Sequence, residues 1–542
     1  MNVPPVSTAT ATGIFPFFAS FISLLAPFGM PVYTCLPGSM ELKPTLEEFR
    51  AQVTGTGVLP VWREFLFDVD TAVTAYAKIR RPPFGFLLES VVGGDQWARY
   101  TFLGSAPAQA WRLHADRAEL WTPDDGWSPI ATDDPLTDLD ERLRVRRPLA
   151  TGGLPRLWGG VVGYFGYDVV RQVEQLPDEP VDDLGLPDGL FMFMDVVLAI
   201  DNLLGRAMAI ATVEVEKELD DDELRRRYDE AAEKTQRLVS QLSEGPSPPP
   251  LEIGPEPTED PAFSSTMTRA EFEAGVESIR EYIFAGDAFQ VVLSQRLAMP
   301  MPAEPFELYR VLRSLNPSPY LYFLELDGFS LVGSSPEVLV RVEDDVVTVR
   351  PIAGTRPRGA TPEEDRAFAL DLQADEKELA EHRMLVDLGR NDVGRVAEYG
   401  SITVPDLMIV ERYSHVMHLS SQVEGKLERG LSAMDVFRAC FPAGTVSGAP
   451  KVRAMEIIDE LEPVRRGPYA GAVGYFGWGG TSMDTAITIR TVLVKDGTAY
   501  VQAGAGIVAD SDPGREYEET LNKARALLRA GAMLTSRPTS DF

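Results

Sequence analysis

Residues 321–355 read LYFLELDGFSLVGSSPEVLVRVEDDVVTVRPIAGT. Short runs of aromatic and β-branched residues alternate here with polar or glycine-containing turns. The pattern predicts consecutive strands, and GAVGYFGWGG (471–480) and TAYVQAGAGIV (498–508) repeat it. Because strands come in groups instead of alternating one for one with helices, the sequence predicts an α+β fold with largely antiparallel sheets.

The clearest break in composition is SEGPSPPPLEIGPEPTEDPAF (243–263), which is too rich in proline and acidic residues to pack as a helix or strand. A helix start follows it, where Thr268 and Glu271 form a capping box, and Gly286 ends that helix. The predicted boundaries are 1–42 for a disordered N-terminal extension, 43–242 for an N-terminal region, 243–265 for a Pro/acid-rich linker and 266–535 for a C-terminal region.

One internal echo links the two regions, since GVVGYFG (160–166) resembles GAVGYFG (471–477). Seven residues do not establish a duplication, because glycine-aromatic strands recur wherever sheets pack closely. We expect both segments to lie in one sheet system that brings the two regions together.

The charge balance limits the partners of this chain. Its 542 residues include 82 acidic and 51 basic ones, a formal net charge of −31. That field repels phosphate backbones and argues against nucleic acid. The only cysteines are Cys35 and Cys440, which fits a reducing cytoplasm. The apolar segment 14–29 lacks a basic flank and is broken by prolines, so we predict neither a signal sequence nor a membrane span.

Two predicted helices carry acidic residues at i, i+3 spacing, one over 375–392 and one over 510–528. Carboxylates that face each other across a cleft suit a hard cation such as Mg²⁺. In so acidic a chain, an isolated E-x-x-E is far more often a solvated helix face. The residues concerned are Glu378 and Glu381 in the first helix and Glu516 and Glu519 in the second.

Three segments have the composition of anion sites. PIAGTRPRG (351–359) combines glycine with arginine around Ala353, and FPAGTVSGAPK (441–451) is a glycine-rich loop that enters a helix. In that loop Thr445, Ser447 and Lys451 would suit a carboxylate, although a simple tight turn explains it as well. Arg490 lies in an apolar strand, where its partner is either a ligand carboxylate or an internal acid.

The histidines and the missing motifs narrow the chemistry further. His382 has the pattern of a helix-surface residue, and His418 lies in a predicted strand, where a lone histidine is more often structural than catalytic. The sequence has no phosphate loop, no dinucleotide-binding fingerprint, no Cys/His zinc spacing and no G-x-S-x-G elbow. Nucleotide and flavin chemistry are therefore disfavoured.

In this order, PIAGTRPRG, ELAEHRMLVDLGRND, FPAGTVSGAPK, GAVGYFG, AGAGIV and the final E-x-x-E resemble the chorismate-utilising enzymes. Within that family the large subunits of anthranilate synthase are the most similar. The resemblance covers about 266–530 strongly, and LLES (87–90) and RYTFLG (99–104) extend it into the N-terminal region. It implies antiparallel sheets packed as a sandwich with flanking helices.

The resemblance implies roles for individual residues. Mg²⁺ would be bound by Glu381 and Glu519, with Glu378 and Glu516 beside them, and would hold the ring carboxylate of chorismate. Glu337 resembles the general acid that protonates the departing 4-hydroxyl, and His418 and Thr445 match positions near the reacting ring, His418 for the loss of pyruvate. The implied chorismate contacts are Gly354, Thr355, Tyr469, Arg490, Gly504, Ala505 and Gly506.

Two positions without an amine indicate which nucleophile is used. Aminodeoxychorismate synthases usually carry a nucleophilic lysine where this chain has Ala353, and isochorismate and salicylate synthases carry a lysine base where it has Gln290. The resemblance therefore implies ammonia as an external nucleophile. Neither Cys35 nor Cys440 has the context of a glutaminase nucleophile, which implies a separate glutamine amidotransferase subunit.

The N-terminal region resembles the family's tryptophan-binding regulatory region. Glu89 would pair with the amino group of tryptophan, and NPSPYLYF (316–323) would supply apolar walls. Plain packing is the alternative for this segment. The implied effector contacts are Glu89, Ser90, Pro319, Tyr320 and Leu321.

Three other functions stay open at this level. Aminodeoxychorismate synthase component I is disfavoured by Ala353, and isochorismate synthase by Gln290. A non-catalytic amino-acid sensor on the same fold would be expected to lose acids at the metal site, yet Glu381 and Glu519 are both present.

Overall fold

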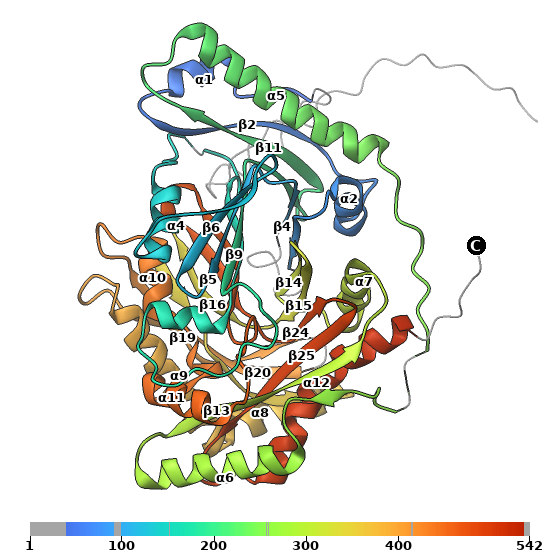
Figure 1. The fold of residues 1–542 in the computed structure, drawn as a ribbon, viewed down its shortest axis with the longest axis vertical. Helices are drawn as coiled ribbons and strands as arrows, with labels where there is room; N and C mark the ends of the chain where they lie inside the picture. Colours follow the sequence, from blue (N-terminus) through green and yellow to red (C-terminus); the bar gives the residue numbers. More distant parts are fainter. Residues whose placement is uncertain are drawn as a thin grey trace, which may run out of the picture. The chain divides into compact units, whose positions relative to one another are not determined.

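The computed structural model describes residues 40–90, 99–150, 152–255, 257, 259–413 and 416–535. A compact unit begins at Leu42. The predicted extension 1–42 therefore lies outside the described residues, except for its last three positions. The predicted α+β class is confirmed, because the strands form two antiparallel sheets with flanking helices (Figure 1).

The first sheet has strands from both regions of the chain. In spatial order its strands are β1 (Leu42–Lys43), β2 (Gly57–Leu66), β11 (Arg206–Val215), β10 (Val196–Asp201), β4 (Tyr100–Ser105), β3 (Gly85–Glu89), β14 (Tyr320–Leu326), β15 (Phe329–Ser335), β24 (Thr491–Lys495), β25 (Thr498–Ile507), β13 (Gln290–Pro300) and β12 (Ser264–Ser265), with β21 (Gly448–Ala449) beside β13.

The second sheet is also shared by the two regions. In spatial order its strands are β18 (Ile352–Pro357), β20 (Val416–Lys426), β17 (Val346–Val349), β16 (Val338–Glu343), β23 (Met483–Ile487), β22 (Ala472–Gly477), β8 (Gly160–Phe165), β9 (Gly189–Met194), β5 (Gln109–His114), β6 (Arg117–Thr122) and β7 (Gly126–Pro129), with β19 (Thr403–Arg412) beside β20.

Helices flank these sheets, and the first long one after the linker starts and stops as predicted. Thr268 and Glu271 form the capping box of α6, and Gly286 ends it with a left-handed φ of 90°. The described α-helices are α1 (Leu46–Gln52), α2 (Ala72–Ile79), α4 (Pro135–Arg144), α5 (Asp221–Glu244), α6 (Arg269–Ala285), α7 (Pro305–Leu315), α8 (Pro362–Ala374), α9 (Glu376–Gly394), α10 (Ala433–Cys440), α11 (Lys451–Leu461) and α12 (Pro513–Thr535).

The two regions repeat one order of elements. The N-terminal region runs β2-α2-β3-β4-β5-β6, then β8-β9-β10-β11-α5, and the C-terminal region runs β13-α7-β14-β15-β16-β17, then β22-β23-β24-β25-α12. In each sheet the equivalent strands follow one another outward from a central pair, β3–β14 or β8–β22. The C-terminal region adds β18 to β20, which includes α8 and α9, between β17 and α10.

The sequence echo lies at the centre of this repeat. β8 and β22 pair antiparallel, and Gly163 lies directly opposite Gly474, the fourth residue of each GYFG-containing motif. A side chain at Gly163 would collide with the backbone of β9, so the strands approach too closely for any other residue. The prediction that both segments share one sheet system is confirmed. Because both regions supply strands to both sheets, neither forms a sheet system of its own.

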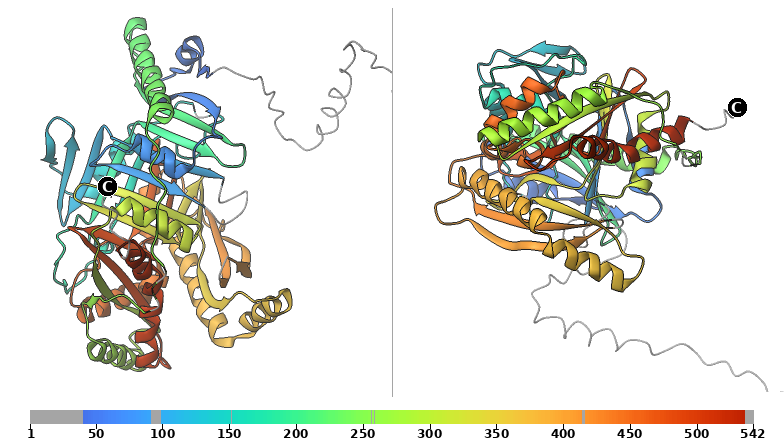
Figure 2. Two further views of the ribbon diagram at one scale, coloured as in Figure 1. Left: turned by 90° about the vertical axis from the view of Figure 1, so that its right-hand side faces the viewer. Right: turned by 90° about the horizontal axis from the view of Figure 1, so that it is seen from below.

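The largest hydrophobic cluster contains residues of both sheets, including Phe86 and Leu331 from the first and Trp111 and Phe476 from the second. A second cluster packs α2, α7 and α12 onto the first sheet, among them Tyr76, Tyr309 and Leu527. Figure 2 shows α6 and α12 side by side below that sheet. The helix α12 therefore packs on the first sheet, and the inserted helix α9 packs on β18 and β20 of the second.

Candidate active site

A cavity of about 550 Å³ lies between α9, α12 and the neighbouring strands. It gathers residues from segments far apart in the sequence, and these include nearly every residue implied for catalysis, metal binding and substrate binding. Those lining it are Glu337, Gly354, Thr355, Glu378, Glu381, His418, Thr445, Tyr469, Arg490, Gly504, Gly506, Glu516 and Glu519. Ala505 is the exception, since its methyl group packs with Phe272 and Ile457 on the other face of β25.

Glu337 follows β15 and is buried at the wall of the cavity. Burial raises the pKa of its carboxyl group to about 8, although the Thr445 hydroxyl and the Ile352 backbone partly offset the effect. The group therefore keeps its proton near neutral pH and can act as a general acid.

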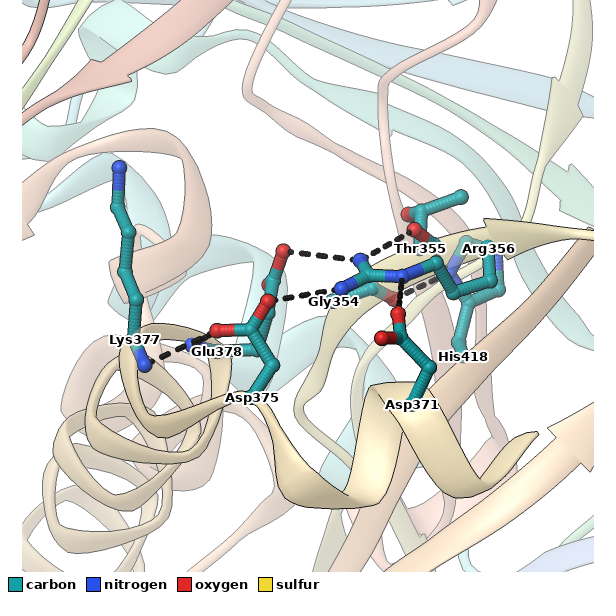
Figure 3. Close-up of polar contacts among 8 residues, drawn as sticks. All are labelled: Gly354, Thr355, Arg356, Asp371, Asp375, Lys377, Glu378 and His418. Carbon is teal, nitrogen blue, oxygen red and sulfur yellow. Dashed lines mark hydrogen bonds and ion pairs between the residues drawn. The ribbon is translucent and has the colours of Figure 1, made fainter. Parts of the chain in front are cut away.

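His418 lies on β20, and its orientation fixes its tautomer. Nδ1 is 2.9 Å from the Gly354 carbonyl oxygen, which can only accept, so Nδ1 carries the hydrogen. Nε2 is then the basic nitrogen. Burial lowers the pKa of the ring, so His418 is neutral at pH 7 and suited to take up a proton. The Thr355 hydroxyl lies 3.0 Å from the same Nδ1 (Figure 3).

The four carboxylates come from two helices that face the cavity. Burial raises the pKa of Glu381, with Glu378 adding to the effect, and burial together with Glu519 raises the pKa of Glu516. Such mutual repulsion is what a bound cation would relieve. Among the described residues, no group of three or more His, Cys, Asp or Glu side chains converges on a metal position.

That arrangement still fits Mg²⁺. This ion keeps several waters and commonly uses one or two protein carboxylates together with substrate oxygens. The residues that could hold the ion are Glu381 from α9 and Glu519 from α12, with Glu378 and Glu516 lining the same cavity.

Lys523 is a cavity residue that the sequence analysis did not assign. Its Nζ donates to the Gly504 carbonyl (2.9 Å) and pairs with Glu519 (2.7 Å). The i, i+4 spacing from Glu519 was the available signal, but that spacing is common on solvated helices. Gln290 also lines the cavity, with Nε2 3.4 Å from Glu381 and a buried Oε1 that has no hydrogen-bond partner among the described residues.

Arg490 follows β23 in a left-handed conformation (φ 52°). Its Nη1 donates to the Lys523 carbonyl (3.1 Å), and no described carboxylate forms an ion pair with it. Burial lowers the pKa of the guanidinium, although Tyr469 and Glu519 oppose that effect. A buried cation that faces a cavity without a paired carboxylate is well placed for a ligand carboxylate.

The two arginines of PIAGTRPRG do not face the cavity as an anion site. Arg356 pairs with Asp371 and Asp375, each at 2.7 Å, and lies 3.5 Å from Glu378 (Figure 3). Arg358 pairs with Asp365 (2.6 Å). The expectation of an arginine-built anion site is therefore wrong: these side chains attach α8 and α9 to β18. Ala353 itself lines the cavity, as Gln290 does.

Two further expectations are corrected. Lys451 pairs with Asp392 (2.9 Å) and Ser447 donates to the Ala443 carbonyl (2.9 Å), so neither is available for a ligand. His382 is fully buried instead of lying on the helix surface, and its Nε2 is 2.6 Å from the Ser421 hydroxyl. Thr445 does line the cavity, beside Glu337.

A second cavity of about 530 Å³ lies between the sheets. Its lining includes all five residues implied for the effector, Glu89, Ser90, Pro319, Tyr320 and Leu321. It also contains a charged pair, in which Arg341 lies 2.7 Å from Asp484 and the Tyr320 hydroxyl lies 3.0 Å from Asp484.

The carboxylate of Glu89 does not face this second cavity. It accepts hydrogen bonds from Tyr309 and from Arg313 (2.8 and 3.1 Å), both on α7. Strand alternation explains this, because Glu89 and its cross-strand partner Leu321 point to the helix-covered face of the sheet. The expected pairing of this carboxylate with an amino group has no support in these contacts.

Comparisons with known proteins identify similar enzymes over most of the chain. A family model for chorismate binding enzymes matches residues 94–529. The chain is 49% identical over 492 residues to anthranilate synthase component 1 of Pseudomonas putida, covering 90% of this chain and 98% of that one. The protein of the same name from Aquifex aeolicus is 45% identical over 492 residues, covering 91% and 98%.

Solved structures give a similar result. Anthranilate synthase component I from Streptococcus pneumoniae aligns with a TM-score of 0.67 at 38% identity, over 86% of this chain and 99% of that chain. The menaquinone-specific isochorismate synthase of Escherichia coli shares the fold, with a TM-score of 0.64 at 18% identity over 90% and 98%. In the part of the chain that the structure describes, no helix combines the length and apolar character needed to cross a membrane.

Proposed function

This chain belongs to the family of chorismate-binding enzymes and is an enzyme of the anthranilate synthase type, and from that premise we propose how its residues share the reaction. Chorismate is aminated at ring carbon C2 with ammonia, and pyruvate is then eliminated to give anthranilate, the first step of tryptophan biosynthesis. A cytoplasmic location stays a prediction. One observation carries the proposal: the cavity combines a protonated acid, a neutral base, an unpaired buried arginine and four carboxylates.

Substrate binding uses both the cationic and the anionic side chains that line the cavity. Arg490 and Tyr469 hold the enolpyruvyl carboxylate, and Gly504 and Gly506 let the ring approach the backbone of β25 closely. When bound by Glu381 and Glu519, Mg²⁺ would supply the positive charge that the ring carboxylate needs in this acidic chain.

In the first step, Glu337 protonates the 4-hydroxyl. The bond from nitrogen to C2 forms, both ring double bonds shift by one position, the bond from C4 to the hydroxyl breaks with loss of water, and the new ammonium nitrogen gives up one proton to solvent. Ammonia fits as the nucleophile because no amine stands at Ala353 or Gln290, both of which line the cavity. The partnerless Oε1 of Gln290 can accept a hydrogen bond from the entering nitrogen.

In the second step, Nε2 of His418 takes the proton from C2. The electron pair makes the ring aromatic while the bond between C3 and the enolpyruvyl oxygen breaks, and the released enolate takes up a proton at carbon to become pyruvate. The Nδ1 hydrogen bond to Gly354 keeps Nε2 basic throughout.

Ammonia itself requires a source, and a glutamine amidotransferase subunit is the proposed partner. Cys440 is buried, and burial raises the pKa of its thiol to about 12, with nearby Asp392 adding to the effect, so it cannot serve as a glutaminase nucleophile. Free ammonium would act as a slower substitute.

Tryptophan is the proposed effector of the second cavity, as a feedback inhibitor. The cavity has aromatic and apolar walls from Phe102, Tyr320 and Tyr475, and the Arg341–Asp484 pair offers one charge of each sign to a zwitterion. Since Glu89 is held by α7, Asp484 is the more suitable carboxylate for the amino group.

The test combines the purified chain, chorismate, Mg²⁺ and ammonium at mildly alkaline pH, with anthranilate fluorescence and pyruvate as readouts. We expect both products, and we expect Glu381→Gln to lose both. Chorismate loss without pyruvate would indicate an isochorismate or aminodeoxychorismate product and overturn the proposal. A well-folded chain that consumes no chorismate but is stabilised against heat by tryptophan alone would support a sensor instead.

A further inference from the structure

Behind the cavity lies an ion pair that the reaction itself does not use. The side chains of Arg466 and Glu462 are 1% and 2% exposed, and they meet through two hydrogen bonds of 2.9 and 2.6 Å. Burial alone would lower the pKa of the Arg466 guanidinium, but the Glu462 carboxylate reverses this and raises it. The pair is therefore charged on both sides, and it lies in a place where charges are costly.

The remaining donors of Arg466 bind two backbone segments of the cavity wall. Nη1 donates to the Val446 carbonyl (2.7 Å), next to Thr445 in the turn η4 (Gly444–Val446). Nη2 donates to the Val292 carbonyl (2.8 Å) on β13, and Val292 itself lines the cavity. One guanidinium thus fixes the distance between the Thr445 turn and β13.

Glu462 extends the same network to a third wall. Its Oε1 accepts from the Ser294 backbone N–H and hydroxyl, both at 2.8 Å. Gln502 on β25 donates to that hydroxyl (2.9 Å) and also lines the cavity. The network therefore spans η4, β13 and β25.

The guanidinium also lies over two tyrosine rings. Its carbon is 5.5 Å from the centre of the Tyr469 ring and 4.6 Å from that of Tyr167, which comes from the N-terminal region. The Tyr469 hydroxyl in turn lies against Gly504, where an added Cβ would be only 2.8 Å away. Arg466 thus contacts the ring of a tyrosine that lines the cavity.

We propose that Arg466 and Glu462 are positioning residues: they set the places of Tyr469 and of the Thr445 turn, and through them the binding of the substrate carboxylate. This inference rests on the proposed function for its kinetic test. A purely structural pair would only stabilise the fold, and replacing both members by apolar residues would then be nearly neutral. A positioning pair cannot be replaced in that way, because apolar side chains bind no carbonyl oxygens.

The main experiment uses Arg466→Lys in the full chain, which keeps the charge but cannot bind a carboxylate and two carbonyls at once. We expect the KM for chorismate to rise about tenfold or more, with a smaller change in kcat and a melting temperature close to that of the unaltered chain. In a double-mutant cycle with Tyr469→Phe, the two changes should be strongly non-additive. An unchanged KM, or simple additivity, would overturn the inference.

Two double variants keep the test decisive even where Arg466→Lys does not fold. Arg466→Met combined with Glu462→Leu should fold but keep the high KM, whereas recovery of the original KM would show that the pair serves stability alone. The matched control is Lys78→Met with Asp70→Leu, a pair at 2.8 Å, 10% and 7% exposed, in the N-terminal region. It should leave the KM for chorismate unchanged, with a melting temperature close to that of the unaltered chain.

Hydrogen exchange on the unliganded Arg466→Lys chain separates this inference from the proposed function. Faster exchange at residues 444–447 and 467–471, with the rest of the chain unchanged, would support positioning even if the chain did not act on chorismate. Unchanged exchange in both segments would contradict it.

Discussion

The N-terminal and C-terminal regions share one order of strands and helices, yet the charged residues of the larger cavity all come from the C-terminal region, whereas those of the second cavity come from both. An insertion accounts for part of this difference. The insertion from β18 to β20 supplies Gly354, Glu378, Glu381 and His418 to the larger cavity. Where the N-terminal region has an equivalent position, only β7 and a short connection lead to α4. The cavity therefore combines residues of the insertion with residues of the repeated scaffold, such as Glu337, Arg490 and Glu519.

The space between the two sheets also differs between the surroundings of Tyr164 in the N-terminal region and those of Tyr475 in the C-terminal region. Tyr164 and Tyr475 occupy the same place in the two GYFG-containing motifs, and each packs edge-on against a phenylalanine, Phe329 at 5.9 Å or Phe102 at 6.1 Å. Phe84 and Trp121 pack edge-on against each other in the hydrophobic cluster that also contains Tyr164. On the Tyr475 side a cavity remains, which has room for an aromatic ligand.

The largest expected effect on turnover comes from replacing Glu337, the proposed proton donor. Glu337→Gln removes the proton donor and should lower kcat by about a hundredfold to ten-thousandfold. In the unaltered enzyme kcat should fall as the pH rises through about 8, because the acid form is needed. A pH profile that stays flat across this range would contradict the assignment.

The same substitution should have an opposite effect on stability. The folded pKa of Glu337 is about 8, above its ordinary value of 4.5, so the folded state loses relative stability as the pH rises from about 4.5 to 8. Glu337→Gln removes that loss. Its melting temperature should therefore exceed that of the unaltered chain at pH 9 and approach it at pH 5.

A second comparison uses the equivalent helices α12 and α5. Glu519→Gln should weaken the apparent affinity for Mg²⁺ by about tenfold or more, with activity partly restored at high Mg²⁺. The matched control is Glu233→Gln on α5, where the side chain is 73% exposed and should leave the Mg²⁺ dependence unchanged. Activity titrations against Mg²⁺ measure both. Equal behaviour of the two variants would remove Glu519 from the metal site.

The third prediction concerns a substitution that fills part of the second cavity with an aromatic ring. Ser90→Phe places a ring at the wall of this cavity. We expect the inhibitory tryptophan concentration to rise about tenfold or more, with kcat retained. Inhibition curves with tryptophan measure this. Unchanged inhibition would place the effector elsewhere.

The smallest effect is expected for a substitution at Phe329, which packs against Tyr164 away from the second cavity. Phe329→Leu removes the edge-on contact with Tyr164 and should lower the free energy of unfolding by about 1 kcal/mol, with turnover and tryptophan response unchanged. Denaturant titration measures it. An altered tryptophan response would mean that the two spaces communicate.

Local patterns predicted the fold well, because strands, caps and turns depend on neighbours in the sequence. The capping box at Thr268, the strands of 321–355 and the pairing of the two GYFG-containing motifs all follow from short segments. The gathering of Glu337, His418 and Glu519 into one cavity followed from the family resemblance. No single segment could have indicated it.

The errors concern side chains whose partners lie far away in the sequence. The carboxylates for Arg356 come from α8 and α9, and the partners of Glu89 come from α7. Nothing near Glu89 in the sequence indicates that its carboxylate binds Arg313. The prediction that His382 lies on the helix surface is wrong for the same reason, because its partner, the Ser421 hydroxyl, lies far away in the sequence on β20.

The central strand pairs β3–β14 and β8–β22 have a consequence for synthesis on the ribosome. When the N-terminal region has emerged, its apolar strands β3 and β8 still lack the partners that the C-terminal region will provide. The β3 edge stays open until β14 (Tyr320–Leu326) has been made, and the β8 edge stays open until β22 (Ala472–Gly477) has been made, and such edges invite aggregation. The acidic, proline-rich linker keeps the later half tethered to these edges, so the nascent chain completes both sheets by closing onto itself.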